Sequence, residues 1–203
     1  MSDTALAGGA ADPVDEIDRA RAAEYALLAT LLWRSPGAQM ISCLALLRGD
    51  ASPLGVAHAG LGAAAARADA EGVKREYFAL FGGLGRGAVL PYASYYLTRS
   101  LYGSPLARLR QSLARLGIER TETHSEPEDH AAILCEIMAG LASGQIAAPA
   151  EAQGEIFAKH LAPWIGRFFA DLERAESVDF YARVGALGRI FVDIESEAFT
   201  LAP

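Results

Sequence analysis

Apolar residues recur at helical spacing along almost the whole chain, and the strict alternation typical of strands is missing. In one clear example, Leu134, Ile137, Met138 and Leu141 follow an i, i+3, i+4, i+7 pattern, which places them on one face of a helix. Ala, Leu, Glu and Arg, which favour helices, fill the segments between them. The pattern predicts an all-α fold, a compact helical bundle, with helices over residues 14–34, 38–48, 53–69, 70–81, 94–102, 105–116, 131–142, 151–173 (divided at Pro163) and 177–199.

The helical pattern is interrupted near the middle of the chain, at Gly117 and the polar segment that follows it. Residues 118–124 contain few helix formers, so we expect a short hinge around residues 117–126. The prediction is a single all-helical domain over residues 13–203, with an N-terminal subdomain at 13–117, a hinge at 118–126 and a C-terminal subdomain at 127–203. Residues 1–12, rich in Ala and Gly, are predicted to form a flexible tail.

The composition restricts the partners and the location of the chain. Its 203 residues are 52% hydrophobic, which suffices to bury a core. The net charge of −7 and the pI near 5.1 favour a cationic partner over nucleic acid or an anionic membrane. No stretch has the features of a secretory signal or a membrane span, and Cys43 and Cys135 lie in apolar helical segments. We therefore expect a cytoplasmic protein with buried, reduced thiols and no stable membrane insertion.

An unusually charged cluster extends from Ser125 to His130, with three carboxylates and one imidazole among its residues. Ser125 and Glu128 have the spacing of a capping box, in which two side chains satisfy backbone N–H groups at a helix start. In this interpretation His130 lies half inside the protein and Asp129 lies near the surface. The cluster is either an ordinary capped helix or a recognition site whose carboxylates attract a cationic ligand.

The sequence gives little support to catalysis, metal binding or a phosphate-binding loop. Residues 82–87 are rich in glycine, but they follow a helix and lack the Gly-Lys-Ser/Thr ending of a P-loop, so a flexible turn is favoured over nucleotide binding. The four histidines show no i, i+3 or i, i+4 pairing, which disfavours a metal site. Asp129 and His130 are adjacent, and adjacent helical side chains point too far apart to form a catalytic dyad. We predict no catalytic residues and no metal.

Aromatic residues are concentrated between Tyr77 and Tyr96, a segment that holds four of the seven tyrosines. Aromatic side chains with hydroxyl groups can close a loop over the core, with each hydroxyl finding an internal partner. They can equally line a groove that accepts an apolar peptide segment in helical or extended form. Both interpretations stay open from the residues alone.

The aromatic segment and the acidic cluster are parts of a longer pattern of motifs. The pattern comprises Tyr77-x-x-Leu80-Phe81-Gly82 with Pro91-x-x-Ser94-x-Tyr96, then Glu126-Pro127-x-Asp129-His130, then Pro163-Trp164 with Phe180-Tyr181. It resembles that of the TorD/DmsD/NarJ family of redox-enzyme maturation chaperones, over about residues 25–198. The second motif is the most specific of the three. The loop at residues 82–87 is richer in glycine than the family pattern.

The resemblance implies an all-helical cytoplasmic chaperone without enzymatic activity. Members of the family bind the twin-arginine leader of a molybdenum oxidoreductase precursor, assist insertion of the molybdenum cofactor and delay export until maturation. On this chain, the resemblance implies that the carboxylates attract the arginines, that His130 hydrogen-bonds the peptide backbone and that the aromatic residues accept the apolar part. The implied peptide-binding residues are Glu126, Glu128, Asp129, His130, Tyr77, Phe81, Pro91, Tyr92, Ser94 and Tyr96. No cofactor is predicted, and the resemblance implies at most weak binding of GTP.

Two other functions compete with this interpretation. One is a weak nucleotide-binding or nucleotide-hydrolysing helical protein, and the other is an assembly subunit that binds only the mature enzyme. Arg108, Arg110 and Arg115 lie just upstream of the acidic cluster and are internal competitors for its carboxylates. A hinge between helical subdomains is compatible with a monomer or a domain-swapped dimer.

Overall fold

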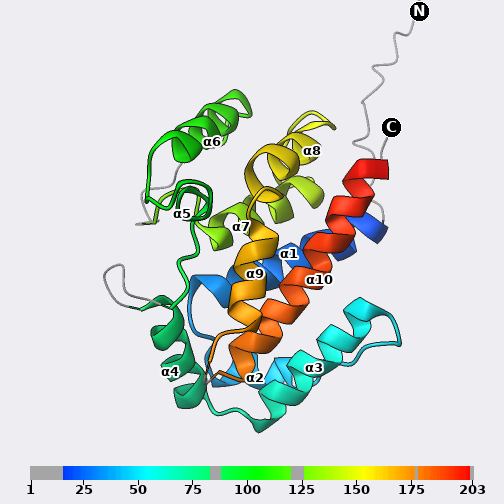
Figure 1. Cartoon of the computed structure of the whole chain (residues 1–203). Coiled ribbons are helices and arrows are strands. Elements are labelled where there is room, and N and C mark those ends of the chain that lie inside the picture. Colours follow the sequence, from blue (N-terminus) through cyan, green and yellow to red (C-terminus); the bar gives the residue numbers. More distant parts are fainter. Residues whose placement is uncertain (1–15, 83–87, 120–125, 177, 202–203) are drawn as a thin grey trace, which may run out of the picture.

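The structure is a computed structural model that describes residues 16–82, 88–119, 126–176 and 178–201. Within these ranges the protein consists of ten α-helices and one π-helix (Figure 1). The elements are α1 (Glu16–Trp33), α2 (Ala38–Leu44), α3 (Pro53–Arg67), α4 (Ala70–Phe81), α5 (Ala93–Thr98), α6 (Ser104–Arg115), α7 (Ala131–Ala142), α8 (Ala152–Ile156), the π-helix η1 (Phe157–Leu161), α9 (Ile165–Glu173) and α10 (Phe180–Leu201). The predicted all-α class is confirmed.

Helix boundaries follow the sequence signals closely in several places. Both α4 and α7 begin and end at the predicted residues, and the predicted division at Pro163 is confirmed, because that proline is exposed between η1 and α9. Two helices, α2 and α5, end well before their predicted last residues. Helix α2 ends at Leu44, and α5 ends at Thr98. The next residue, Arg99, has a left-handed backbone conformation with φ of 60°, and this conformation cannot continue a right-handed helix.

The core is continuous across the two predicted subdomains. Helix α1 packs along α7, and α10 packs against both α9 and α3 (Figure 1). Tyr25, Trp164 and Tyr181 are among the largest fully buried side chains and belong to one hydrophobic cluster. The predicted tail and residues 120–125 of the predicted hinge lie outside the described residues, so the division at residues 117–126 stays a prediction.

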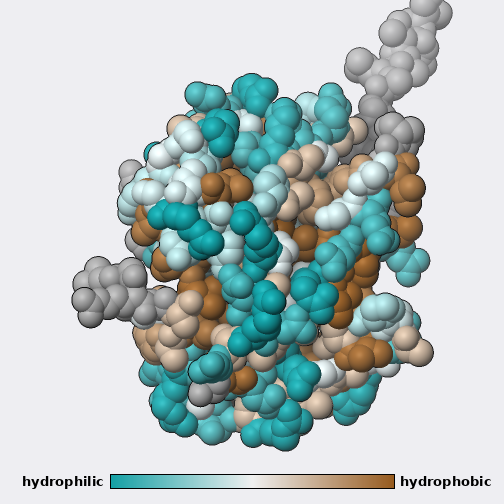
Figure 2. Space-filling model, in the orientation of Figure 1, coloured by the Kyte–Doolittle hydropathy of each residue, from teal (hydrophilic) through white to brown (hydrophobic). Residues whose placement is uncertain are grey.

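Polar residues cover much of the molecular face seen in Figure 2, with apolar residues visible between the helices. Cys43 is exposed at the protein surface rather than buried in the core, contrary to the prediction, because the short α2 buries only Ile41 and Leu44. Cys135 is buried, as predicted. None of the described helices combines the length and the apolar composition needed to cross a bilayer.

The long helix α10 receives its N-terminal cap from a distant residue. Both carboxylate oxygens of Glu76, in α4, accept hydrogen bonds from the backbone N–H groups of Asp179, Phe180 and Tyr181, at 3.0–3.4 Å. These N–H groups have no partner within the helix itself. Glu76 therefore fastens the start of α10 to α4.

We expect Glu76→Ala to lower the free energy of unfolding by about 1–2 kcal/mol, the usual cost of losing a helix cap. Chemical denaturation followed by circular dichroism measures this change. Glu71→Ala is the matched control, because this glutamate lies on the same helix and its ion pair with Lys74 is exposed and 4.0 Å long. Equal stability of the two variants would show that the cap contributes nothing.

Candidate functional site

Two of the sequence motifs, far apart in the chain, meet as a pair of short extended segments. The backbone N–H of Ala93 donates to the carbonyl oxygen of Asp129 at 3.0 Å, and the N–H of Ala131 donates to that of Pro91 at 2.8 Å. Tyr92 and His130 face each other across this antiparallel bridge. The Pro-x-x-Ser motif and the Asp-His motif thus form one structural unit at the starts of α5 and α7.

Asp129 is the cap of α5. Its Oδ2 accepts a hydrogen bond from the backbone N–H of Ser94 at 2.8 Å, while its own carbonyl oxygen holds the N–H of Ala93. The residue is completely buried, so the predicted position near the surface is wrong. The reason is that Asp129 lies in a turn just before the bridge residue His130, which brings its segment against the start of α5. Its Oδ2 is directed to the protein's own backbone, while Oδ1 is buried with no hydrogen-bond partner among the described residues.

His130 is the N-cap of α7. Its Nδ1 accepts a hydrogen bond from the N–H of Ala132 at 3.1 Å, and its ring packs edge-on against Tyr92 and Trp33. The side chain is buried rather than half inside, and burial lowers its pKa to about 4. The predicted capping box is wrong for Glu128, because the helix starts after His130. Ser125, the other residue of the predicted box, lies outside the described residues.

Most of the aromatic residues predicted to bind a peptide instead make contacts within the protein interior. The Tyr77 hydroxyl donates to the carbonyl oxygen of Trp33, at the end of α1, and its ring packs on Phe81 and Tyr181. The Tyr96 hydroxyl donates to Asp171 at 2.9 Å, and its ring packs on the buried Trp164. Pro91 and Ser94 are buried as well. The interpretation in which aromatic side chains close over the core accounts for these contacts.

Tyr92 is the exception, because it connects the bridge to the surface. Its hydroxyl donates a hydrogen bond of 2.6 Å to Oε2 of Glu126. Burial is the largest cause, and this hydrogen bond the second, of a pKa for the Tyr92 hydroxyl well above its ordinary value. The bond holds the Glu126 carboxylate at the edge of a groove.

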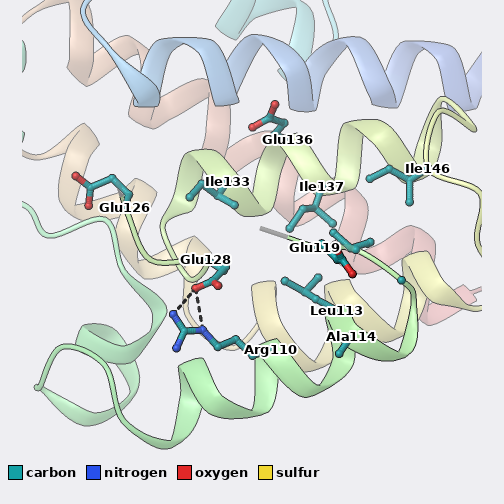
Figure 3. Close-up of a pocket in the computed structure, with 12 residues that line it drawn as sticks. Arg110, Leu113, Ala114, Glu119, Glu126, Glu128, Ile133, Glu136, Ile137 and Ile146 are labelled. Carbon is teal, nitrogen blue, oxygen red and sulfur yellow. Dashed lines mark hydrogen bonds and ion pairs between the residues drawn. The ribbon is translucent and has the colours of Figure 1, made fainter. Parts of the chain in front are cut away.

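The groove lies between α6 and α7 and has a volume of about 470 Å³ (Figure 3). Side chains from both helices project into it, Leu113 and Ala114 from α6 and Ile133 and Ile137 from α7. Both described ends of the predicted hinge border it. The complete lining is Arg110, Leu113, Ala114, Gly117, Ile118, Glu119, Glu126, Glu128, Ile133, Glu136, Ile137 and Ile146.

The rim of the groove is strongly acidic. Four glutamates line it, Glu119, Glu126, Glu128 and Glu136, and Arg110 is the one cationic side chain among the described lining residues. The Arg110 guanidinium donates to Oε2 of Glu128 through both Nε and Nη2, at 3.0 and 2.8 Å. This hydrogen bond raises the pKa of Arg110. An apolar floor with a negative rim is suited to a ligand that is cationic at one point and apolar beside it.

The far end of the groove is closed by the turn after α7. The backbone N–H of Ile146 donates to the carbonyl oxygen of Gly140 at 2.9 Å, which folds the turn back over the helix. A Cβ at position 140 would lie 2.6 Å from Cδ1 of Ile146, so a larger residue there requires the end of the Ile146 side chain to move. Glu136 lies on the ridge of α7 and also lines a second groove, between α7 and α1.

The structure therefore separates the ten predicted peptide-binding residues into three groups. Glu126 and Glu128 line the groove, with Tyr92 directly behind Glu126. Asp129 and His130 lie buried beneath the start of α7, and Tyr77, Phe81, Pro91, Ser94 and Tyr96 do not line the groove. Sequence reasoning missed the aliphatic floor and Glu136. A usable signal was present, because α7 is apolar on every face except at Glu136.

Other candidate sites receive no support from the described residues. In this part of the chain, no three His, Cys, Asp or Glu side chains lie close enough together to hold a metal ion. Residues 83–87, most of the glycine-rich loop weighed for nucleotide binding, lie outside the described ranges.

The fold and the groove define an all-helical protein with an acidic, apolar-floored surface between α6 and α7. A family model described as the nitrate reductase delta subunit matches residues 48–170, more than half of the chain. The protein belongs to this family, and its predicted resemblance to the TorD/DmsD/NarJ group is confirmed.

Named relatives agree with this assignment. The chain is 29% identical over 116 residues to the chaperone protein TorD of Vibrio cholerae, covering 53% of each sequence. It is 32% identical over 102 residues to the Tat proofreading chaperone DmsD of Salmonella typhimurium, covering 49% of this chain and 48% of the relative. The matched region thus spans about half the length of these curated relatives.

A solved structure shares the fold. It is the crystal structure of an Archaeoglobus fulgidus protein described as a redox enzyme maturation protein, with a TM-score of 0.58 and 20% sequence identity. The likeness covers 85% of this chain and 93% of the other. At this identity the comparison supports the helical architecture.

Proposed function

We propose that the protein is a cytoplasmic, system-specific chaperone for a molybdenum oxidoreductase. In this role it binds the twin-arginine leader and the apo form of the precursor, assists cofactor insertion and delays export until maturation is complete. The single observation that carries the proposal is the groove between α6 and α7, whose apolar floor and glutamate rim complement a basic head followed by an apolar segment. The family and the names of the relatives agree with it.

The arrangement of the lining supports one direction for the bound peptide. In Figure 3, Glu126 and Glu128 lie toward one end of the groove, and Ile137 and Ile146 lie toward the other end, with Glu119 beside Ile137. When the arginines of the peptide bind at the acidic end, the apolar residues that follow them in the peptide lie over the aliphatic floor. Partly desolvated guanidinium–carboxylate bonds then add geometric selectivity for arginine over lysine.

We expect the double substitution Glu126→Gln with Glu128→Gln to weaken binding of a twin-arginine peptide about tenfold or more, because two charge-assisted hydrogen bonds become neutral ones. Isothermal titration calorimetry with a synthetic peptide, twin arginine followed by an apolar segment, measures the affinity. Glutamine at position 126 keeps an oxygen acceptor for the Tyr92 hydroxyl, so the site retains its local structure.

Glu197→Gln is the matched control, since it removes an exposed carboxylate from α10, away from the groove lining. Unchanged affinity in the double variant would remove the groove assignment while leaving the family intact. Binding of mature enzyme without binding of the leader would favour the assembly-subunit alternative. Nucleotide turnover that is lost on changing His130 would favour the nucleotide-hydrolysing alternative.

A further inference from the structure

One of the three arginines in α6 points into the groove. Arg110 reaches from α6 to Glu128, in the segment just before α7, and its side chain is 51% exposed while that of Glu128 is 12% exposed. The other two arginines are directed elsewhere. Arg115 pairs with Glu155 at 2.8 Å, and Arg108 borders a different small pocket, beside Leu97 and His160.

The contact between Arg110 and Glu128 shows which chemical group the acidic end of the groove accepts. Two guanidinium nitrogens, Nε and Nη2, share one carboxylate oxygen at 3.0 and 2.8 Å (Figure 3). An arginine of a bound peptide carries the same donors. Half of the Arg110 side chain is in solvent, and its guanidinium is carried by a long flexible aliphatic chain. The ion pair between Arg110 and Glu128 is therefore weak and readily exchanged.

We propose that Arg110 is an internal competitor of the leader, one that neutralises the acidic end of the groove and is displaced by an arginine of the bound peptide. The inference rests on the proposed function and adds its regulation. Because a bound peptide must displace Arg110, the groove binds cationic peptides less tightly than it would without this residue. A peptide with one isolated cation therefore gains little by displacing it. A peptide with two adjacent arginines replaces the lost charge at Glu128 and also supplies a cation for Glu126.

The test compares three variants in titrations with the twin-arginine peptide and with a single-arginine peptide of otherwise identical sequence. Arg110→Met keeps the aliphatic stem and removes the charge, and we expect it to tighten binding of both peptides about three- to tenfold at low ionic strength. The single-arginine peptide should gain more, which narrows the preference for twin arginine. Added salt should shrink these gains.

Two controls separate this effect from a general change in charge. Arg108→Met removes another exposed arginine from the same helix, outside the groove, and should leave both affinities near wild type. Arg110→Lys keeps the charge but loses the planar donor pair, so its affinities should lie between those of the wild type and Arg110→Met. Thermal unfolding of each variant verifies that the fold is retained.

The outcomes distinguish this inference from the proposed function. If the wild type binds the twin-arginine peptide and Arg110→Met binds it equally or more weakly, the competitor role is wrong and the proposed function stands. Binding that appears only in Arg110→Met supports the competitor role directly. If neither protein binds the peptide, the leader-binding function and the competitor role are both overturned.

Discussion

Replacing Asp129 by alanine should lower the free energy of unfolding by about 2 kcal/mol, because a buried backbone N–H loses a side-chain acceptor that water cannot replace. The acceptor is Oδ2, which holds the N–H of Ser94 at 2.8 Å in a completely buried position. The hydrogen bond from Ala93 to the Asp129 carbonyl is unaffected by the substitution. Asp129→Asn keeps a neutral oxygen acceptor and should lose less stability than Asp129→Ala.

Urea denaturation followed by circular dichroism measures these differences. Asp193→Ala, which removes an exposed carboxylate from α10, is the control and should change the stability by no more than about 0.5 kcal/mol. A stability of Asp129→Ala equal to that of the control would contradict the capping role. In that case a loss of peptide binding in Asp129→Ala would point to direct contact with the leader.

Acidification should destabilise the protein through His130, by up to roughly 3 kcal/mol between pH 6.5 and pH 4. Burial lowers the pKa of His130 from 6.5 to about 4, and its Nδ1 must stay unprotonated to accept from Ala132. Above pH 6.5 the imidazole is neutral in both the folded and the unfolded state, so its contribution to stability is complete. As the pH falls, the unfolded chain binds the proton first, and each tenfold difference in proton affinity is worth about 1.4 kcal/mol.

Denaturation midpoints of the wild type and of His130→Asn across this pH range isolate the effect. Asparagine retains an acceptor suited to an N-cap, so the variant should be less stable at neutral pH but lose less stability on acidification. His160 contributes in the same direction because burial lowers its pKa, and His58 contributes in the opposite direction because Glu24 raises its pKa. Both contributions are common to the two proteins, and parallel pH profiles would contradict the role assigned to His130.

The helices were predictable because their signals are local. Periodic apolar residues and helix-ending residues fixed α4 and α7 to the residue, and Pro163 marked the break before α9. Where the prediction was wrong, a distant segment decided the outcome. Asp129 is predicted to lie near the surface, but pairing between its segment and that of Tyr92 places it in the interior.

The groove was only half predictable for the same reason. The cluster around Glu126 and Glu128 is conspicuous in the sequence, and it does line the groove. The floor combines Leu113 with Ile133 and Ile137, residues that follow the ordinary core pattern of their own helices. Only the placement of α6 across the groove from α7 shows that these core-like residues border a cavity, and this placement has no signal within either helix.

The two long-range caps have a consequence for how the chain folds. Glu76, before the predicted hinge, caps α10 after it, and Asp129, after the hinge, caps α5 before it. Each half of the chain thus completes a helix of the other, and a helix as short as α5 has little stability of its own in water. We therefore expect α5 to form late, once the halves have docked, and the whole chain to fold and unfold in one cooperative transition.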